Sequence, residues 1–194
     1  MKKVACFYAD GFEEVELLSV VDVLRRAGVQ ADLISITGEA PVSAHGVAIK
    51  ADLFIDETAM DEYDVIYIPG GSKGAELLGQ KDEVLKAIRD FHELGKKVAA
   101  ICAGPTVLER AGILKGQAGT SYPSFENELS FETYREDLVV VSNNVITSRG
   151  PGTALLLGFE ILRELELSDE ADRIWQDMLM DKLEFHFKQG HPRH

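Results

Sequence analysis

The stretch Lys97-Val-Ala-Ala-Ile-Cys-Ala-Gly-Pro-Thr-Val-Leu108 indicates a strand that turns abruptly into a helix. Val98 to Ile101 is an apolar run that is too short for a helix and long enough for a buried strand. Pro105 follows closely, and proline is well tolerated in the first turn of a helix, because its missing N–H would have no intrahelical partner there. We therefore predict a helix over 106–111 and a tight turn at Cys102.

This turn gives Cys102 the setting of a nucleophile elbow. In such an elbow the side chain is held beyond the end of the sheet, among backbone N–H groups and beside a helix N-terminus. The positive end of the helix predicts a lowered thiol pKa, and the thiolate is the reactive form of cysteine. The alternative is that Cys102 is a small buried core residue, since free cysteine is often buried. The turn favours the reactive thiol.

Composition places the chain among ordinary globular proteins. Its 194 residues are 45% hydrophobic and 8% aromatic, which is enough for one domain with a sizeable core. We expect that domain to cover residues 1–188, with a loose tail over 189–194. The formal net charge of -13 argues against nucleic acid and anionic membranes as partners, because both require clustered Lys and Arg.

The chain also lacks the sequence signals of export. Lys2 and Lys3 precede only a short apolar stretch, so no signal peptide is expected, and no apolar run is long enough to span a bilayer. Two cysteines, Cys6 and Cys102, do not make a disulfide framework in a chain of this length. We expect a cytoplasmic protein with reduced thiols.

Strands alternate with helices along the whole chain. The predicted strands cover residues 4–8, 31–36, 65–68, 98–101, 138–141 and 145–147. The predicted helices cover residues 13–27, 83–94, 106–111, 154–165 and, after a Ser168 cap, 170–183. Residues 42–49 suggest a small hairpin or an edge excursion. This alternation predicts a single doubly wound α/β domain, with a mostly parallel sheet and helices on both faces.

Three acids crowd the start of the first predicted helix. Glu13 and Glu14 are explained by the helix dipole, which favours negative charge near a helix N-terminus. The dipole explains Glu16 less well, because Glu16 lies nearly a turn further in and closer to the apolar face. Glu16 is therefore a candidate functional carboxyl.

A glycine-rich segment, Pro69-Gly-Gly-Ser-Lys-Gly74, follows the strand at 65–68. Backbone N–H groups in such a segment can cradle an anion, and a plain turn is the alternative. The glycine spacing matches neither a dinucleotide fingerprint nor a nucleotide-hydrolase phosphate loop. In doubly wound sheets, ligands bind beyond the carboxyl ends of the strands, so we expect Glu16, the Gly70-Gly71 segment and Cys102 to meet there.

These features, in this order, resemble the ThiJ/PfpI superfamily, and within it the parkinsonism-associated deglycase branch. The motifs that carry the resemblance are Asp10-Gly-Phe-Glu-Glu-Val-Glu16, Val21-Asp-Val-Leu-Arg-Arg-Ala-Gly28, Ile68-Pro-Gly-Gly71, Ala99-Ala-Ile-Cys-Ala-Gly-Pro-Thr106 and Thr147-Ser-Arg-Gly-Pro-Gly-Thr153. They span nearly the whole chain. The resemblance implies a flavodoxin-like fold and a homodimer.

The resemblance also implies roles for single residues. It implies that Cys102 is the reactive thiol and that Glu16 is its hydrogen-bonded partner. Gly71 and Ala103 are implied to donate backbone N–H groups to an oxyanion. A carboxyl and a thiol in contact share a proton, because both cannot ionise cheaply, so a protonated Glu16 could donate to a Cys102 thiolate or sulfinate.

The chain departs from the family pattern at two positions. Many relatives carry a His where this chain has Tyr122, within Gly119-Thr-Ser-Tyr-Pro123, and a phenol is a poor base at neutral pH. Glu16 would then have to move the proton alone. The protease branch carries a His directly after the cysteine, where this chain has Ala103, and that difference argues against peptidase activity.

Two further residues match positions near the family's pocket. His45 could bind an anionic group there, and an exposed loop histidine is the other interpretation. Arg149 matches a pocket arginine, with a solvated surface residue as the alternative. The remaining histidines, at positions 92, 186, 191 and 194, show no metal-ligand spacing, so the sequence predicts neither a metal site nor a cofactor.

The sequence thus leads to two functional hypotheses. The first is a cofactor-free thiol enzyme of the glyoxalase or deglycase type. It would act on small reactive dicarbonyls such as methylglyoxal, or on their adducts, in a pocket that includes Gly70, Tyr122, Arg149 and His45. The second is a redox sensor or stress-protective protein whose Cys102 oxidises to a sulfinate without turnover.

Overall fold

A computed structural model describes residues 1–188, and the predicted loose tail at 189–194 lies outside them. A seven-stranded sheet forms the centre of the molecule, in the order β3-β2-β1-β4-β5-β9-β8. Its strands are β1 (Lys3–Tyr8), β2 (Gln30–Ser35), β3 (Leu53–Phe54), β4 (Val65–Ile68), β5 (Lys97–Ile101), β8 (Val139–Ser142) and β9 (Val145–Ser148). All neighbouring strands pair in parallel except β8, which pairs antiparallel with β9.

The strand order confirms the predicted flavodoxin-like fold. The five parallel strands β2-β1-β4-β5-β9 have the order 2-1-3-4-5 that is typical of this fold. The chain leaves β1 toward β2 on one side and returns to β4 on the other, so the topological switch point lies between β1 and β4. A crevice for ligands is expected at the carboxyl ends of these strands.

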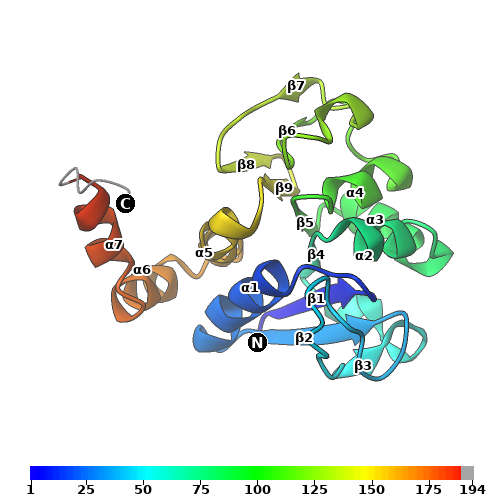
Figure 1. Cartoon of the computed structure of the whole chain (residues 1–194), viewed down its shortest axis with the longest axis horizontal. Coiled ribbons are helices and arrows are strands. Elements are labelled where there is room, and N and C mark those ends of the chain that lie inside the picture. Colours follow the sequence, from blue (N-terminus) through cyan, green and yellow to red (C-terminus); the bar gives the residue numbers. More distant parts are fainter. Residues whose placement is uncertain (189–194) are drawn as a thin grey trace.

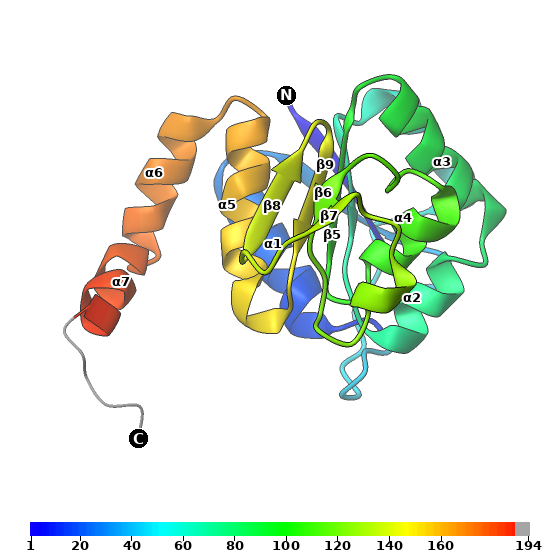
Figure 2. The same ribbon diagram turned by 90° about the horizontal axis from the view of Figure 1, so that it is seen from above.

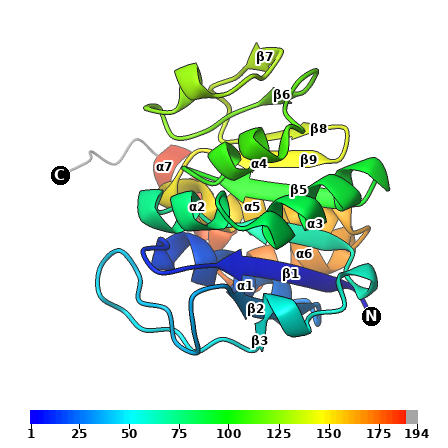
Figure 3. The ribbon, with the colours of Figure 1, turned by 90° about the vertical axis from the view of Figure 1, so that its right-hand side faces the viewer.

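A second, two-stranded sheet extends the molecule beyond one edge. It pairs β6 (Ala118–Gly119) with β7 (Thr133–Tyr134) in parallel. Figure 3 shows the main strands stacked from β3 to β8, with β6 and β7 beyond β8. Residues 114–129 are irregular apart from β6 and one 3-10 turn, Glu126–Glu128.

Helices cover both faces of the main sheet, as predicted. One face carries α1 (Glu14–Arg26) and α5 (Ala154–Glu164), and the other carries α2 (Ser72–Leu78), α3 (Asp82–Glu93) and α4 (Pro105–Ala111) (Figures 1 and 2). Alternation along β1 separates two cores, because successive side chains of a strand point to opposite faces. Cys6 and Tyr8 pack with Leu17 of α1, whereas Phe7 packs with Ile88 of α3.

The sequence analysis missed helix α2, as well as the two-residue strands β3, β6 and β7. The glycine-rich segment is a loop only as far as Gly71, and α2 begins at Ser72. Gly74 concealed this helix, because glycine is a poor helix former. Its role is close packing, since a Cβ on Gly74 would lie 2.9 Å from the backbone nitrogen of Phe12.

The last predicted helix is two helices. α6 (Ser168–Asp177) and α7 (Met180–Lys188) are separated at Leu179, which has a φ of 60°. Ser168 was predicted to cap the helix, but it is the first helical residue, and no side chain caps this end. Both helices lie on the far side of α5 from the sheet (Figure 2).

The loop regions follow the sequence prediction more loosely. Residues 42–49 form an excursion with one antiparallel bridge, between Val42 and Ala48, and no strand. The acidic connection before β4 contains two 3-10 turns, Ile55–Glu57 and Met60–Glu62, and a further one, Pro151–Thr153, precedes α5. Within residues 1–188, every helix falls short of the length and apolarity that crossing a bilayer requires.

Phe159 tests the contribution of the α1/α5 core. Its side chain is fully buried and makes an edge contact with Trp175, with ring centroids 5.0 Å apart. We predict that Phe159→Ala lowers the free energy of unfolding by about 3–5 kcal/mol, because the lost burial leaves a cavity. Chemical denaturation measures this change. Phe185→Ala is the matched control: that ring is 60% exposed, and its removal should cost less than about 0.5 kcal/mol.

Candidate active site

Cys102 occupies a strained turn between β5 and α4. Its φ of 61° lies in the left-handed region, which costs a residue with a side chain about 1–2 kcal/mol. The turn is held from both sides: the Cys102 N–H donates to the carbonyl of Ser148 (3.0 Å), and the Tyr122 N–H donates to the carbonyl of Cys102 (3.1 Å). The predicted elbow is present, and its strain is maintained by neighbouring elements.

Glu16 lies fully buried against this elbow. Its Oε2 accepts a hydrogen bond from the N–H of Gly70 (2.7 Å), and its backbone carbonyl accepts one from the Tyr67 hydroxyl (3.0 Å). Its Oε1 is buried without a conventional hydrogen-bond partner among residues 1–188, and the polar side chain that interacts with this carboxyl is the Cys102 thiol. The predicted pairing of Glu16 with Cys102 is therefore present in the structure.

Two glycines allow this close approach. A Cβ on Gly70 would lie 2.4 Å from Oε2 of Glu16 and 2.7 Å from Cβ of Cys102, so a larger residue does not fit between them. Gly71 has a φ of 87°, and a Cβ there would lie 2.2 Å from the carbonyl oxygen of Gly11. The backbone N–H groups of Gly71 and Ala103 both interact with the Cys102 sulfur.

Burial controls the electrostatics of the pair. It raises the pKa of Glu16 to about 7, against hydrogen bonds from Cys102 and Gly70, and the negative charge of Glu13 adds to the rise. It also raises the pKa of Cys102 to about 12, and the charge and hydrogen bond of Glu16 contribute further. Because ionisation of one group opposes ionisation of the other, the pair does not carry two negative charges at once.

The sequence prediction of a lowered thiol pKa is wrong in sign. The N–H groups of Ala103 and Gly71 do lower the pKa of Cys102, as the elbow suggested. Desolvation and the neighbouring carboxyl outweigh them, because α4 is only seven residues long and Glu16 is in direct contact with the thiol. The sulfur therefore needs Glu16 to accept its proton before it becomes a strong nucleophile.

A pocket of about 370 Å³ opens onto the pair. Its walls are Glu13, Glu16, Ala44, His45, Gly71, Ser72, Cys102, Tyr122, Ser124, Phe125 and Pro151. The sequence analysis had proposed five of these as site residues, namely Glu16, His45, Gly71, Cys102 and Tyr122. They come from the segments after β1, β4 and β5 and from two loops, so the expected convergence at the carboxyl ends of the strands is observed.

The remaining residues of the predicted site lie behind or beside the pocket. The N–H of Gly70 donates to the carboxylate of Glu16, and the N–H of Ala103 interacts with the Cys102 sulfur. Arg149 is not among the residues that line the pocket and donates to Oγ1 of Thr120 (3.3 Å), and its role in the pocket stays a prediction. Several residues that line the pocket were not predicted to do so. Pro151 belongs to the motif at 147–153, whereas no sequence motif marked Ser124 or Phe125.

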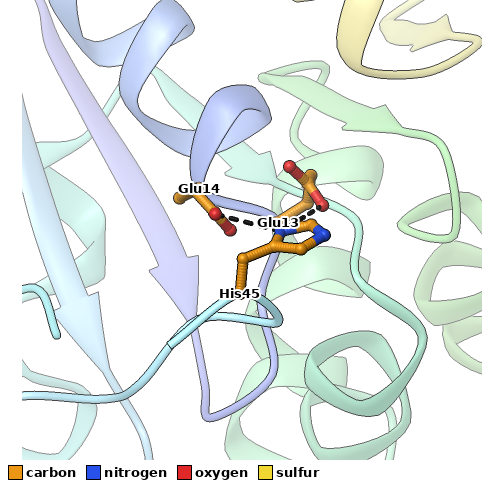
Figure 4. A group of neighbouring side chains, drawn as sticks. All are labelled: Glu13, Glu14 and His45. Carbon is orange, nitrogen blue, oxygen red and sulfur yellow. Dashed lines mark hydrogen bonds and ion pairs between the residues drawn. The ribbon is translucent and has the colours of Figure 1, made fainter. Parts of the chain in front are cut away.

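His45 is at the rim of the pocket and is 67% exposed. Its Nδ1 lies 3.0 Å from Oε1 of Glu14 and 3.6 Å from Oε2 of Glu13 (Figure 4). The hydrogen bond to Glu14 and the charges of both carboxylates raise the pKa of His45. Because these carboxylates occupy its Nδ1 side, the geometry does not favour the predicted anion-binding role.

Comparison with known proteins shows the family to which the chain belongs. The model of the DJ-1/PfpI family matches residues 2–164. The chain belongs to this family. DJ-1beta of Drosophila melanogaster is 36% identical over 182 residues, which is 92% of this chain and 97% of that protein. The Parkinson disease protein 7 homolog of Danio rerio is 33% identical over 184 residues, again 92% and 97% of the two chains. The resemblance seen in the motifs is thereby confirmed.

Solved structures of DJ-1 proteins superpose closely on the chain. Oxidized DJ-1 of Toxoplasma gondii gives a TM-score of 0.87 at 34% identity, over 92% of this chain and 98% of that one. The crystal structure of Drosophila melanogaster DJ-1beta gives a TM-score of 0.87 at 36% identity, over 92% and 97%. The DJ-1/PfpI fold therefore extends over nearly the whole chain.

Glu16→Gln tests the electrostatic coupling in this DJ-1/PfpI site. Because the carboxylate raises the pKa of Cys102, we predict that its removal lowers that pKa. The ultraviolet absorbance of the thiolate, followed against pH, measures the shift, and Cys102→Ser supplies the background. A Cys102 pKa that is unchanged or higher in Glu16→Gln would contradict the coupling.

Proposed function

We propose that this DJ-1/PfpI protein is a cofactor-free thiol enzyme that converts small dicarbonyls such as methylglyoxal into hydroxy acids. The observation that carries the proposal is the buried Glu16–Cys102 pair at the base of the pocket, with two backbone N–H groups directed at the sulfur. A carboxyl with a pKa near 7 both accepts and donates protons at neutral pH. The pocket volume suits a small substrate.

The first step would activate the sulfur as it reacts. Ionised Glu16 accepts the Cys102 proton while Sγ bonds to the aldehyde carbon, and the product is a hemithioacetal. The electron pair of the carbonyl moves onto its oxygen. The N–H groups of Gly71 and Ala103 would stabilise that oxyanion, until Glu16 returns the proton to it.

The later steps would move two protons within the hemithioacetal and then add one water. Glu16, ionised again, removes the proton from the carbon that carries sulfur and delivers it to the neighbouring carbonyl carbon. The hemithioacetal hydroxyl gives up its proton as the thioester forms, and the oxygen of the neighbouring carbon gains one and becomes the hydroxyl of the product. Water then cleaves the thioester, releasing lactate and restoring the thiol. The sum is methylglyoxal plus water to lactate and a proton, with no net oxidation. No step assigns a proton to Tyr122.

Lactate formation tests this proposal directly. We predict that the wild-type protein produces lactate from methylglyoxal in the absence of glutathione and that Cys102→Ser does not. Glu16→Gln should lose at least about 100-fold in kcat, the lower range for a lost general base. Enzymatic assay of the lactate formed measures both effects. Lactate at the Cys102→Ser background from the wild-type protein would exclude the glyoxalase function.

Redox sensing is the second candidate function. The observation that favours it is the contrast between the two thiols: Cys6 is fully buried in the sheet, whereas Cys102 lines the pocket. A relative of known structure, the Toxoplasma gondii DJ-1, is described as oxidized. In this function two molecules of peroxide would oxidise Cys102 in turn, first to a sulfenate and then to a sulfinate, each becoming water. Glu16 in its protonated form would stabilise the sulfinate by a hydrogen bond.

Mass spectrometry after mild peroxide treatment tests the second candidate. We predict that two oxygen atoms are added at Cys102 and none at Cys6, because peroxide does not reach the buried thiol. Equal oxidation of both cysteines, or of neither, would contradict selective sensing.

Under either function, a cytoplasmic location is part of our proposal, since Cys102 must remain reduced to react. The homodimer implied by the resemblance stays a prediction.

A further inference from the structure

Glu13, Glu14 and His45 form a cluster at the rim of the pocket that the proposed chemistry does not use. Their ligand atoms lie within 4.8 Å of one another (Figure 4). We propose that this cluster is a binding site for a divalent transition-metal cation of the zinc class, separate from the Glu16–Cys102 pair. The proposal does not depend on the dicarbonyl chemistry.

The distances match those of a coordination shell. Zinc bonds to His nitrogen and carboxylate oxygen are about 2.0–2.2 Å long, so two ligands of a tetrahedral shell lie about 3.3–3.5 Å apart. Nδ1 of His45 lies 3.0 Å from Oε1 of Glu14 and 3.6 Å from Oε2 of Glu13. All three ligand atoms lie within 4.8 Å of one another, so adjustment of the side chains would bring them into contact with one cation.

The charges at the cluster are poorly balanced without a cation. Nδ1 of an imidazole carries at most one proton, whereas two carboxylates converge on it. Both carboxylates are largely shielded, with side chains 14% and 16% exposed for Glu13 and Glu14. Oε2 of Glu14 is buried and has no hydrogen-bond partner within residues 1–188. A divalent cation would neutralise both carboxylates at one point.

The backbone holds the ligands in place from two separate segments. Glu13 and Glu14 start α1, and His45 lies in the excursion at 42–49. The Gly11 N–H donates to the carbonyl of Val42 (2.7 Å), and the Ala44 N–H donates to the carbonyl of Phe12 (2.8 Å). These bonds fix the segments against each other, so little chain entropy is lost when a cation binds.

The ligand types favour one class of cation. Imidazole nitrogen suits zinc, copper and nickel, whereas calcium and magnesium prefer shells made of oxygen alone. Three protein ligands leave a fourth position open. Because Glu13 and His45 also line the pocket, that position adjoins the cavity in which Cys102 reacts, and it suits a carbonyl or carboxylate oxygen of a pocket ligand.

Zinc titration by calorimetry tests the proposal, in the Cys102→Ser background so that the thiol does not bind the metal. We expect one Zn²⁺ per chain. His45→Gln and Glu14→Gln, each added to this background, should weaken binding at least about tenfold, as is typical of disrupted metal sites. Glu83→Gln is the matched control, because Glu83 also lies in the first turn of a helix, α3, and should leave the affinity unchanged.

Each outcome decides the question. Binding that the two ligand variants weaken and the control does not would establish the site. Failure of the Cys102→Ser protein to bind zinc would overturn the proposal. It would also be overturned if the His45→Gln and Glu14→Gln variants bound zinc as tightly as the Cys102→Ser protein from which they are made. Circular dichroism of each variant confirms that a lost signal is not lost folding. Lactate formation is not measured, so the result is independent of the proposed activity.

Discussion

The structure of this site depends on one constraint: a carboxyl and a thiol are buried in contact, where water cannot stabilise a second negative charge. Desolvation is the largest cause of the raised pKa at both Glu16 and Cys102. Because the charge of each group opposes ionisation of the other, the pair behaves as one acid–base unit. A single proton that moves between sulfur and oxygen is what makes such a pair chemically useful.

The fold provides this contact by removing side chains from the space between the two groups. Gly70 lies where any Cβ would strike both Glu16 and Cys102, and its N–H instead donates to the carboxylate. The elbow holds Cys102 at a positive φ through hydrogen bonds to and from its neighbours. The strain is small beside the cooperative packing of the sheet, so the turn persists without a glycine at this position.

The same region also concentrates negative charge at the switch point between β1 and β4. Glu13 is the N-cap residue of α1 and Glu14 its first residue, where the helix dipole favours acids, and Glu16 lies in the same first turn. His45 offsets part of this charge at the pocket rim. The site thus has two layers, a buried proton-sharing pair and an outer group of ligands, and they share the residues that start one helix.

Much of this was predictable from the sequence, because strands, helix starts and turns depend on neighbouring residues. The apolar run before Cys102 and the proline after it predicted the elbow. The position of Glu16, away from the helix start, marked it as more than a dipole partner. Helix α2 was missed, because Gly74 has a low helix propensity that tertiary packing against Phe12 overrides.

Other properties were decided only by the tertiary structure. The sequence predicted a thiol made acidic by a helix end, but burial raises the pKa of Cys102, since desolvation depends on everything packed around the sulfur. Arg149 belongs to a recognised motif, and only the folded chain brings its guanidinium to the hydroxyl of Thr120. The group of Glu14 and His45 joins residues 31 positions apart. Local propensity is carried by adjacent residues, whereas burial, charge and ligand geometry act through space and exist only once the chain has folded.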